Sequence, residues 1–352
     1  MADARSRSLP GHAAPEHVQP ASAQLREAGP ISLREQMLRP RTFISFGISI
    51  ALIAWIFARQ EIPFAQVWAN IRAANPWLIL LAFAAYYSTF YVRTLRWKQV
   101  LANVGYTSHN EACLPRRRTL TRIIFLSWFA NSILPAKLGD GYRGYLLKRN
   151  SNVSFSKTMG TIVAERIADV GALFALLLGA GMLAFRDHLP PNFGVLVGFG
   201  AALAALSLST LFVLKYIGPW VARMLPGRVR PHYVRMEEGV LLAYRRRVGW
   251  ILFLTLLVWI LDSARFWFVA ASLGQSFSPA LVVFIALAAA LLTTVPFTPA
   301  GLGVVEGAVV AALLLVIDDR ALAGSIALLD RTITYWLLII VGAVVYLFSN
   351  NK

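Results

Sequence analysis

Eight ionisable side chains lie inside strongly apolar stretches of this sequence, where they could bind a charged group or carry protons. They are Glu165, Arg166, Asp169, Asp262, Arg265, Glu306, Asp330 and Arg331. A charged side chain at the centre of a membrane helix costs about 2.5–3.5 kcal/mol, so it needs a partner or a polar cavity. Two interpretations stay open. The residues form a buried ion-pair network that holds the helices together, or they form a site for a polar head group or for proton coupling.

The spacing of these residues predicts some of the pairs. Residues three positions apart share one face of a helix, so Arg166 can pair with Asp169 and Asp262 with Arg265. The adjacent residues Asp330 and Arg331 point about 100° apart and need partners on other helices.

The more distant partners are predicted from an alignment of the two halves of the chain, described below. It pairs Arg331 with Glu165 and Arg166 with Asp330.

Two turns carry the same Pro-Ala-x-Leu-Gly core, in "PAKLGDGYR" at 135–143 and "PAGLGVVE" at 299–306. Each interrupts an apolar stretch that is too short to cross a membrane and return. We therefore expect two re-entrant hairpins, although an ordinary loop at the first turn and a plain turn between full helices at the second remain alternatives. The candidate lipid-binding residues in these turns are Lys137, Gly139, Asp140, Arg143, Gly301, Gly303 and Glu306.

The turn residues suit an anionic ligand for three reasons. The glycines permit positive φ and close approach of backbone. The helix that follows each turn directs partial positive charge at the turn. Lys137 and Arg143 flank the first turn and could bind a lipid phosphate.

Composition places the chain among all-α polytopic membrane proteins. It has 352 residues, of which 57% are hydrophobic and 14% charged, with a mean hydropathy of +0.60. The one cysteine, Cys113, excludes an internal disulfide, and no histidine spacing fits a metal site, so we expect neither metal nor cofactor. The net charge of +17 lies mostly in loops, which indicates membrane orientation rather than nucleic-acid binding.

Six spanning helices are predicted, behind a disordered basic tail at 1–42 and before a short end at 349–352. The predicted spans are 43–58, 76–98, 158–184, 193–215, 249–271 and 321–348. Lysine and arginine concentrate in 93–157, with twelve, and in 215–248, with eight, which places both termini in the cytoplasm. If 279–317 crosses twice, the chain has eight spans with the same orientation.

The domain at 43–348 contains an internal repeat, 43–185 and 193–348. The Pro-Ala-x-Leu-Gly cores lie 164 residues apart, Arg96 and Arg265 lie 169 apart, and Glu165–Arg166 precedes Asp330–Arg331 by 165. Three spans in each half place the second half upside down in the membrane. An inverted repeat with interrupted helices is typical of transporters.

Four stretches resemble the transmembrane region of lysylphosphatidylglycerol synthases, a flippase-like integral membrane family, over about 43–348. They are "ILPAKLGDGYRGYLLKR", "VAERIADVGAL", "VPFTPAGLGVVEGAVVAALL" and "LLDRTITYWLLIIVGAVVYL". The family's Pro-x-x-x-Gly-Glu turn and following Arg match Pro135, Gly139, Asp140 and Arg143, with Asp140 in place of Glu.

The other candidate site residues also match motifs of this family. The Glu-Arg-x-x-Asp motif matches Glu165, Arg166 and Asp169, and the final Arg matches Arg331. The Gly-Gly-Leu-Gly-x-x-Glu motif matches residues 300–306, with Ala300 departing from the first Gly and Glu306 matching the last position.

The resemblance implies a lipid flippase in a bacterial inner membrane, with aminoacylated phospholipids as the substrates of the best-known members. No aminoacyl-transferase domain is seen, so we expect no enzyme activity. Expected partners are membrane lipids with anionic head groups, a lipid-modifying enzyme and a second copy of the chain, but not nucleic acid. The alternative is a non-transporting accessory protein of a lipid, hopanoid or polyprenyl-glycan pathway.

Overall fold

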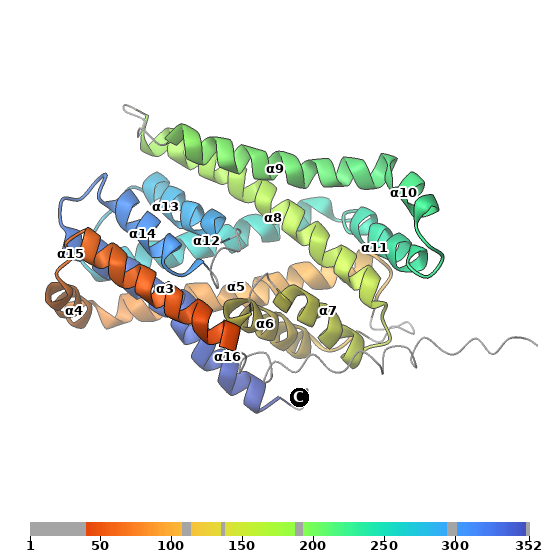
Figure 1. Cartoon of the computed structure of the whole chain (residues 1–352), viewed down its shortest axis with the longest axis horizontal. Coiled ribbons are helices and arrows are strands. Elements are labelled where there is room, and N and C mark those ends of the chain that lie inside the picture. Colours follow the sequence, from red (N-terminus) through yellow and green to blue (C-terminus); the bar gives the residue numbers. More distant parts are fainter. Residues whose placement is uncertain (1–39, 108–113, 135–137, 187–192, 294–300, 350–352) are drawn as a thin grey trace, which may run out of the picture. The chain divides into compact units, whose positions relative to one another are not determined.

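The structure is a computed structural model that describes residues 40–349, except 108–113, 135–137, 187–192 and 294–300. The chain divides into two units, Met1–Ser32 and Leu33–Lys352. The first unit, and with it most of the predicted tail, lies outside the described residues. The second unit is all-helical over the part that is described (Figure 1).

Five long apolar helices could cross a membrane by length and composition. They are α5 (Pro76–Asn103), α8 (Phe155–Ala184), α9 (Phe193–Tyr216), α12 (Val248–Ser272) and the continuous rod Arg320–Leu347. The rod is made of α15 (Arg320–Arg331), the π-helix η3 (Thr332–Trp336) and α16 (Leu337–Leu347). These five match five of the six predicted spans. The remaining one, 43–58, falls on α3 (Pro40–Arg59), whose described apolar part, Ile50–Arg59, is shorter than a span.

Local sequence signals start two of the helices that line the site. The side chain of Asn75 accepts a hydrogen bond of 3.0 Å from the backbone N–H of Trp77 at the start of α5. Ser278 caps α13 (Pro279–Leu292) in the same way, through the N–H of Leu281 at 3.3 Å. A proline follows each cap, where its missing N–H costs nothing and its fixed φ suits the first turn.

Both predicted interruptions are present as breaks between short helices. α6 (Arg117–Ile133) ends before α7 (Leu138–Asn150) begins, and α13 ends well before α14 (Val304–Leu313). The Pro-Ala part of each turn lies outside the described residues. At the second turn Gly301 and Gly303 have φ of +73° and +86°, which glycine adopts without steric cost.

The packing of the helices follows one scheme in both halves (Figure 1). α5 packs along α12, α6 packs on α5, and α13 packs on α12. α7 packs on α8, as α14 packs on α15. In addition α13 lies against α8 and α16 lies against α6, so the last long helix of each half contacts a short helix of the other.

Shorter helices complete the described fold. α4 (Phe64–Ala73) packs on α15, α10 (Gly218–Met224) follows α9, and α11 (Arg230–Leu242) packs on α8. Gly160 of α8 and Gly239 of α11 bring the two backbones into contact, because a Cβ on Gly160 would lie 2.1 Å from the Met236 carbonyl oxygen. Small residues allow such close approach between membrane helices.

The π-helix η3 begins directly after Arg331 and forms two hydrogen bonds with the first half of the chain. The hydroxyl of Tyr86 donates to the Thr334 carbonyl at 3.2 Å. The hydroxyl of Tyr335 donates to the Ser132 carbonyl at 3.1 Å. Short π-helical segments inside α-helices occur often at functional sites.

Candidate functional site

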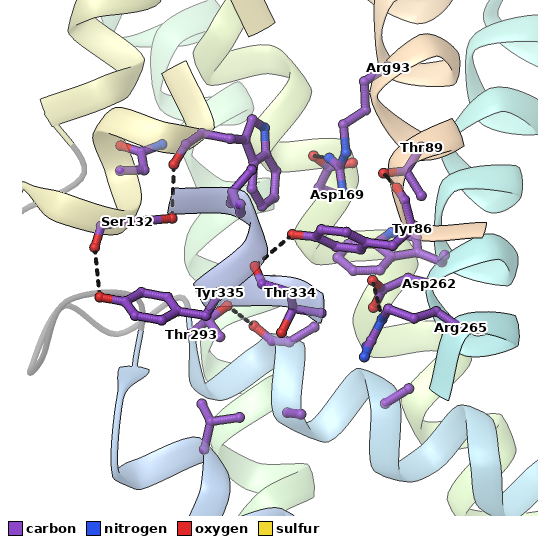
Figure 2. A pocket seen from close by; sticks show the side chains of 18 of the residues that line it. Tyr86, Thr89, Arg93, Ser132, Asp169, Asp262, Arg265, Thr293, Thr334 and Tyr335 are labelled. Atoms are coloured by element: carbon purple, nitrogen blue, oxygen red, sulfur yellow. Dashed lines mark hydrogen bonds and ion pairs between the residues drawn. The ribbon is translucent and has the colours of Figure 1, made fainter. Parts of the chain in front are cut away.

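A central cavity of about 340 Å³ lies among α5, α6, α7, α8, α12, α13, α14 and the rod Arg320–Leu347 (Figure 2). Both halves of the chain contribute to its wall. Its aromatic residues are Tyr86, Phe90, Trp128, Trp259 and Tyr335. Its charged residues are Arg93, Asp140, Arg166, Asp169, Asp262, Arg265, Asp330 and Arg331. The cavity therefore combines apolar surface with fixed charges, as sites for amphipathic ligands do.

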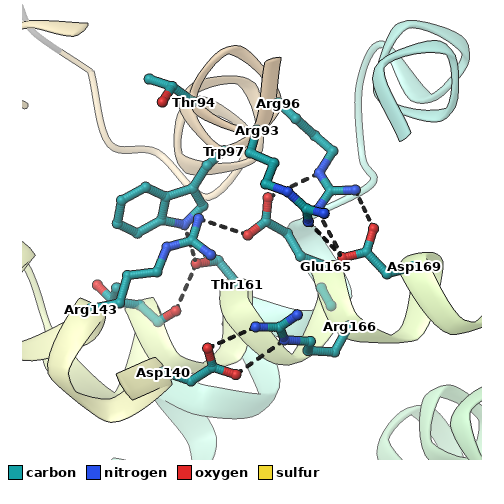
Figure 3. A network of polar contacts seen from close by, with 12 residues as sticks. Arg93, Thr94, Arg96, Trp97, Asp140, Arg143, Thr161, Glu165, Arg166 and Asp169 are labelled. Atoms are coloured by element: carbon teal, nitrogen blue, oxygen red, sulfur yellow. Dashed lines mark hydrogen bonds and ion pairs between the residues drawn. The ribbon is translucent and has the colours of Figure 1, made fainter. Parts of the chain in front are cut away.

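Arg96 of α5 forms the centre of the first ion-pair network (Figure 3). Its guanidinium donates to Glu165 at 3.1 Å, to Asp169 at 3.0 Å and to the Thr255 hydroxyl at 3.0 Å. Arg143 approaches the other oxygen of Glu165 at 2.8 Å. Arg96, Arg143, Glu165 and Asp169 are all buried, so each charge depends on the others for its solvation.

Asp140 and Arg166 form a two-pronged ion pair at the edge of the same network. The Nε and Nη2 atoms of Arg166 donate to the two carboxylate oxygens of Asp140 at 3.1 and 2.8 Å. The Asn131 amide donates to Asp140 at 3.1 Å. Asp140 lies in the first turn of α7, where a carboxylate also interacts favourably with the helix dipole.

The second half contains ion pairs of its own. Glu306, in the first turn of α14, accepts from Arg331 at 2.9 Å and from the N–H of Gly303 at 2.7 Å. Arg265 forms an ion pair with Asp330 and lies 3.5 Å from Asp262.

These contacts correct three predicted pairs and confirm a fourth. Glu165 pairs with Arg96 and Arg143, so the predicted pair Glu165–Arg331 is wrong. Arg166 pairs with Asp140 and Asp169 pairs with Arg96, so the predicted pairs Arg166–Asp330 and Arg166–Asp169 are wrong as well. The predicted contact between Asp262 and Arg265 is present. The pairs form within each half because α5 and α12 bring their own arginines to the acidic residues.

Ten of the twelve candidate site residues fall into three groups. Asp140, Arg166, Asp169, Asp330 and Arg331 line the central cavity. Glu165 and Glu306 do not line it: Glu306 pairs with the wall residue Arg331, and Glu165 pairs with Arg96 and Arg143. Gly301 and Gly303 form the second turn, and Lys137 lies outside the described residues.

Arg143 and Gly139 are buried against protein rather than placed in the cavity wall. The Arg143 guanidinium lies 3.8 Å from the centre of the Trp97 ring. A Cβ on Gly139 would lie 2.1 Å from the Ser127 carbonyl oxygen, so this glycine brings α7 onto α6. Whether Arg143 binds a phosphate stays a prediction.

Sequence reasoning missed Arg93 as a cavity residue and used Arg96 only as a repeat landmark. Both were counted with the basic loop 93–157, because they lie near the predicted end of the second span at residue 98. In the structure α5 continues to Asn103, which places both arginines inside the helix and buries them. Their spacing of three residues, matched by Asp262 and Arg265, is the signal that could have shown this.

Comparison with known proteins agrees with the fold. Residues 42–342 match the sequence profile of the family described as "Lysylphosphatidylglycerol synthase TM region". A UPF0104 membrane protein of Methanocaldococcus jannaschii is 30% identical over 224 residues, which are 63% of this chain and 95% of that protein. A UPF0104 membrane protein of Pyrococcus horikoshii is 24% identical over 341 residues, 88% of this chain and 96% of that one.

A third relative carries an enzyme name. Glycosyltransferase AglD of Haloferax volcanii is 24% identical over 368 residues, which are 93% of this chain but 57% of AglD. These three relatives are archaeal, whereas the sequence led us to expect a bacterial membrane. With the family profile matched over most of its length, the chain is a multi-pass membrane protein that belongs to the lysylphosphatidylglycerol synthase transmembrane-region family.

Proposed function

We propose that this protein moves a polar-headed lipid between the two leaflets of its membrane. The observation that carries the proposal is the central cavity of about 340 Å³, whose wall gathers charged and aromatic side chains from both halves among apolar helices. Polar lining would solvate a head group during its passage, while the acyl chains stay against the apolar helix surfaces.

We infer that the two halves form an inverted repeat. Arg96 with Glu165 corresponds to Arg265 with Asp330, and the helix-terminal pair Asp140–Arg166 corresponds to Glu306–Arg331. The exchanged packing of α13 on α8 and of α16 on α6 supports the same two-fold relation. In such folds one half rocks against the other around a fixed site, so the cavity opens to each side in turn.

In this arrangement α6–α7 and α13–α14 are re-entrant hairpins, entering from the cytoplasm and from outside respectively. Backbone at membrane depth has to be covered by protein or to line a cavity. Two observations support the proposal: Asp140 and Val305, each in the first turn after an interruption, line the same cavity. The sequence holds no phosphate-binding Gly-x-x-x-x-Gly-Lys-Ser/Thr motif, so movement that is coupled to an energy source would use an ion or proton gradient.

Reconstitution into liposomes with fluorescent lipids of several head groups tests the proposal. The variant Ala290→Phe would fill the cavity without removing an ion pair, and Ala288→Phe, on the same helix but not in the cavity wall, is its matched control. We expect wild type and Ala288→Phe to move at least one lipid between leaflets, and Ala290→Phe to move it at least about tenfold more slowly, the equivalent of about 1.4 kcal/mol in the barrier. Equal rates in both variants, or no movement by the wild type, would contradict the proposal.

One observation favours a second candidate function. The match covers 93% of this chain but only 57% of AglD. In this candidate function the chain is a non-transporting membrane partner of a separate lipid-modifying enzyme. In that case it has no enzyme activity of its own. Absence of lipid movement, together with co-purification of an enzyme that acts on lipid-linked sugars, would favour this candidate.

A further inference from the structure

Two equivalent positions of the repeat carry opposite charges. Arg93 and Asp262 each precede the central arginine of their half, Arg96 or Arg265, by three residues. Arg96 matches Arg265, and Glu165–Arg166 matches Asp330–Arg331, with arginine opposite arginine and carboxylate opposite carboxylate, whereas Asp169 aligns with Thr334. These pairs form within each half, whereas Arg93 and Asp262 are equivalent positions in the cavity wall that differ in the sign of their charge. They are therefore the candidates for recognition of a ligand with two different ends.

Arg93 lies in the cavity wall with its donors largely unused. Its one ion pair among the described residues is with Asp169, at 3.8 Å, which is too long for a hydrogen bond. Its guanidinium lies over the Trp128 ring, 4.5 Å from the ring centre, and 6.0 Å from the centre of the Trp259 ring. A guanidinium beside aromatic rings in a cavity wall, with few of its N–H donors used, is suited to bind a phosphate.

Asp262 is the corresponding acid. Its only ion pair within the described part of the chain is with Arg265 at 3.5 Å, and Arg265 also binds Asp330. Asp262 makes no hydrogen bond there, and 15% of its side chain is exposed, against 5% for Asp330. Figure 2 shows Arg93 and Asp262 with Tyr86 between them in this view. No ion pair joins the two directly.

The charges around the cavity balance. Among the described residues, six arginines (Arg93, Arg96, Arg143, Arg166, Arg265, Arg331) meet six carboxylates (Asp140, Glu165, Asp169, Asp262, Glu306, Asp330). A ligand with net charge would leave this weakly polarisable site unbalanced, whereas a ligand with one charge of each sign would not. This favours a different head group from the anionic one that the sequence led us to expect.

We propose that the cavity binds a zwitterionic head group, with its phosphate at Arg93 and its ammonium group at Asp262. The inference rests on the proposed function for the use of this site, but it can be tested without transport. The unpartnered indole N–H of Trp259, one helical turn from Asp262, is buried and supplies a further donor for the phosphate or its ester oxygens.

The test measures binding of short-chain phosphatidylethanolamine and phosphatidylglycerol to the purified full chain, from the rise in its melting temperature. We expect the wild type to bind the ethanolamine lipid about tenfold more tightly, because one charge-assisted contact distinguishes the two lipids. Asp262→Asn should remove this preference and should not weaken binding of the glycerol lipid. Arg93→Gln should weaken both lipids about tenfold, since both carry the phosphate.

Arg93→Lys keeps the charge and should retain part of the affinity. If it does so while Arg93→Gln binds weakly, the weak binding of Arg93→Gln results from loss of the phosphate contact and not from loss of folding. Glu61→Gln, in an exposed ion pair away from the cavity, is the control. A wild type that prefers the glycerol lipid or binds neither, or an Asp262→Asn variant that weakens both lipids alike, overturns the inference. Binding with the expected preference but no lipid movement in liposomes would instead refute the transport proposal alone.

Discussion

Glu165 is the residue on which two buried arginines converge. Replacing it with alanine would leave Arg96 and Arg143 without their shared carboxylate in an environment that cannot solvate them. Loss of one member of a buried pair costs about 3–5 kcal/mol. We expect Glu165→Ala to lower the yield and the melting temperature of purified protein strongly, as measured by gel filtration and thermal unfolding.

The exposed ion pair between Glu61 and Arg320, at 3.0 Å, provides the contrast. Glu61→Gln should change the free energy of unfolding by about 0–1 kcal/mol, because water screens such pairs. If Glu165→Ala is as mild as Glu61→Gln, the buried network is not structural, and Glu165 is then free to act on a ligand.

Gly303 adopts a φ of +86°, and a Cβ there would lie 2.5 Å from Leu52. Alanine would be strained in its backbone and would press on α3, at a cost of about 1–3 kcal/mol for each effect. We expect Gly303→Ala to lower the melting temperature. Gly179→Ala, where a Cβ meets open space on α8, should not lower it.

The identity of the buried charges could be predicted from the sequence, but their partners could not. The cost of burying a charge marks Glu165, Glu306 and Arg331 wherever they occur in an apolar run. Which charges meet depends on the rotation and depth of each helix, and these are set by packing between helices far apart in the sequence. A shared helix face alone does not determine the pair either: Asp262 lies beside Arg265 as predicted, but Arg166 pairs with Asp140 rather than with Asp169.

At the scale of elements, the contact of α8 with α11 depends on two glycines. A Cβ on Gly239 would lie 2.3 Å from the Lys157 carbonyl oxygen, and the Tyr244 hydroxyl ties the same region to the Ala164 carbonyl at 2.9 Å. We expect Gly239→Ala to separate the two helices and lower the melting temperature. Gly171→Ala, with no neighbour near its Cβ on the same helix α8, should leave it unchanged or raise it.

A rise in melting temperature for Gly239→Ala would contradict this close contact. It would mean that α11 is held by its other contacts and that the glycine pair only permits approach.

The long helices and the two interruptions were predictable, because hydropathy over about twenty residues and a Pro/Gly turn are local signals. α4, α10 and α11 were not, since they are short and mix polar with apolar residues inside segments predicted as loops. The π-helix η3 has no local signal either. Its Thr334 carbonyl is held by Tyr86, a residue 248 positions away in the sequence.

At the scale of the whole molecule, the proposed inverted repeat requires the loop after α5 and the loop after α12 to lie on opposite sides of the membrane. We expect cysteines placed at Thr107 and at Ser276, in a chain with Cys113→Ala, to react with an impermeant thiol reagent from opposite sides, Ser276 from outside. Labelling of both from one side would overturn the inverted arrangement.

The balance of six arginines and six carboxylates around the cavity has an electrical consequence. Moving one elementary charge through a membrane potential changes its energy by about 2.3 kcal/mol per 100 mV, so a site with net charge would feel the voltage at every step. A neutral cluster that rocks around a neutral zwitterion does no net electrical work. Without a coupled ion, lipid movement in liposomes should therefore proceed at the same rate with the inside positive, negative or at zero potential.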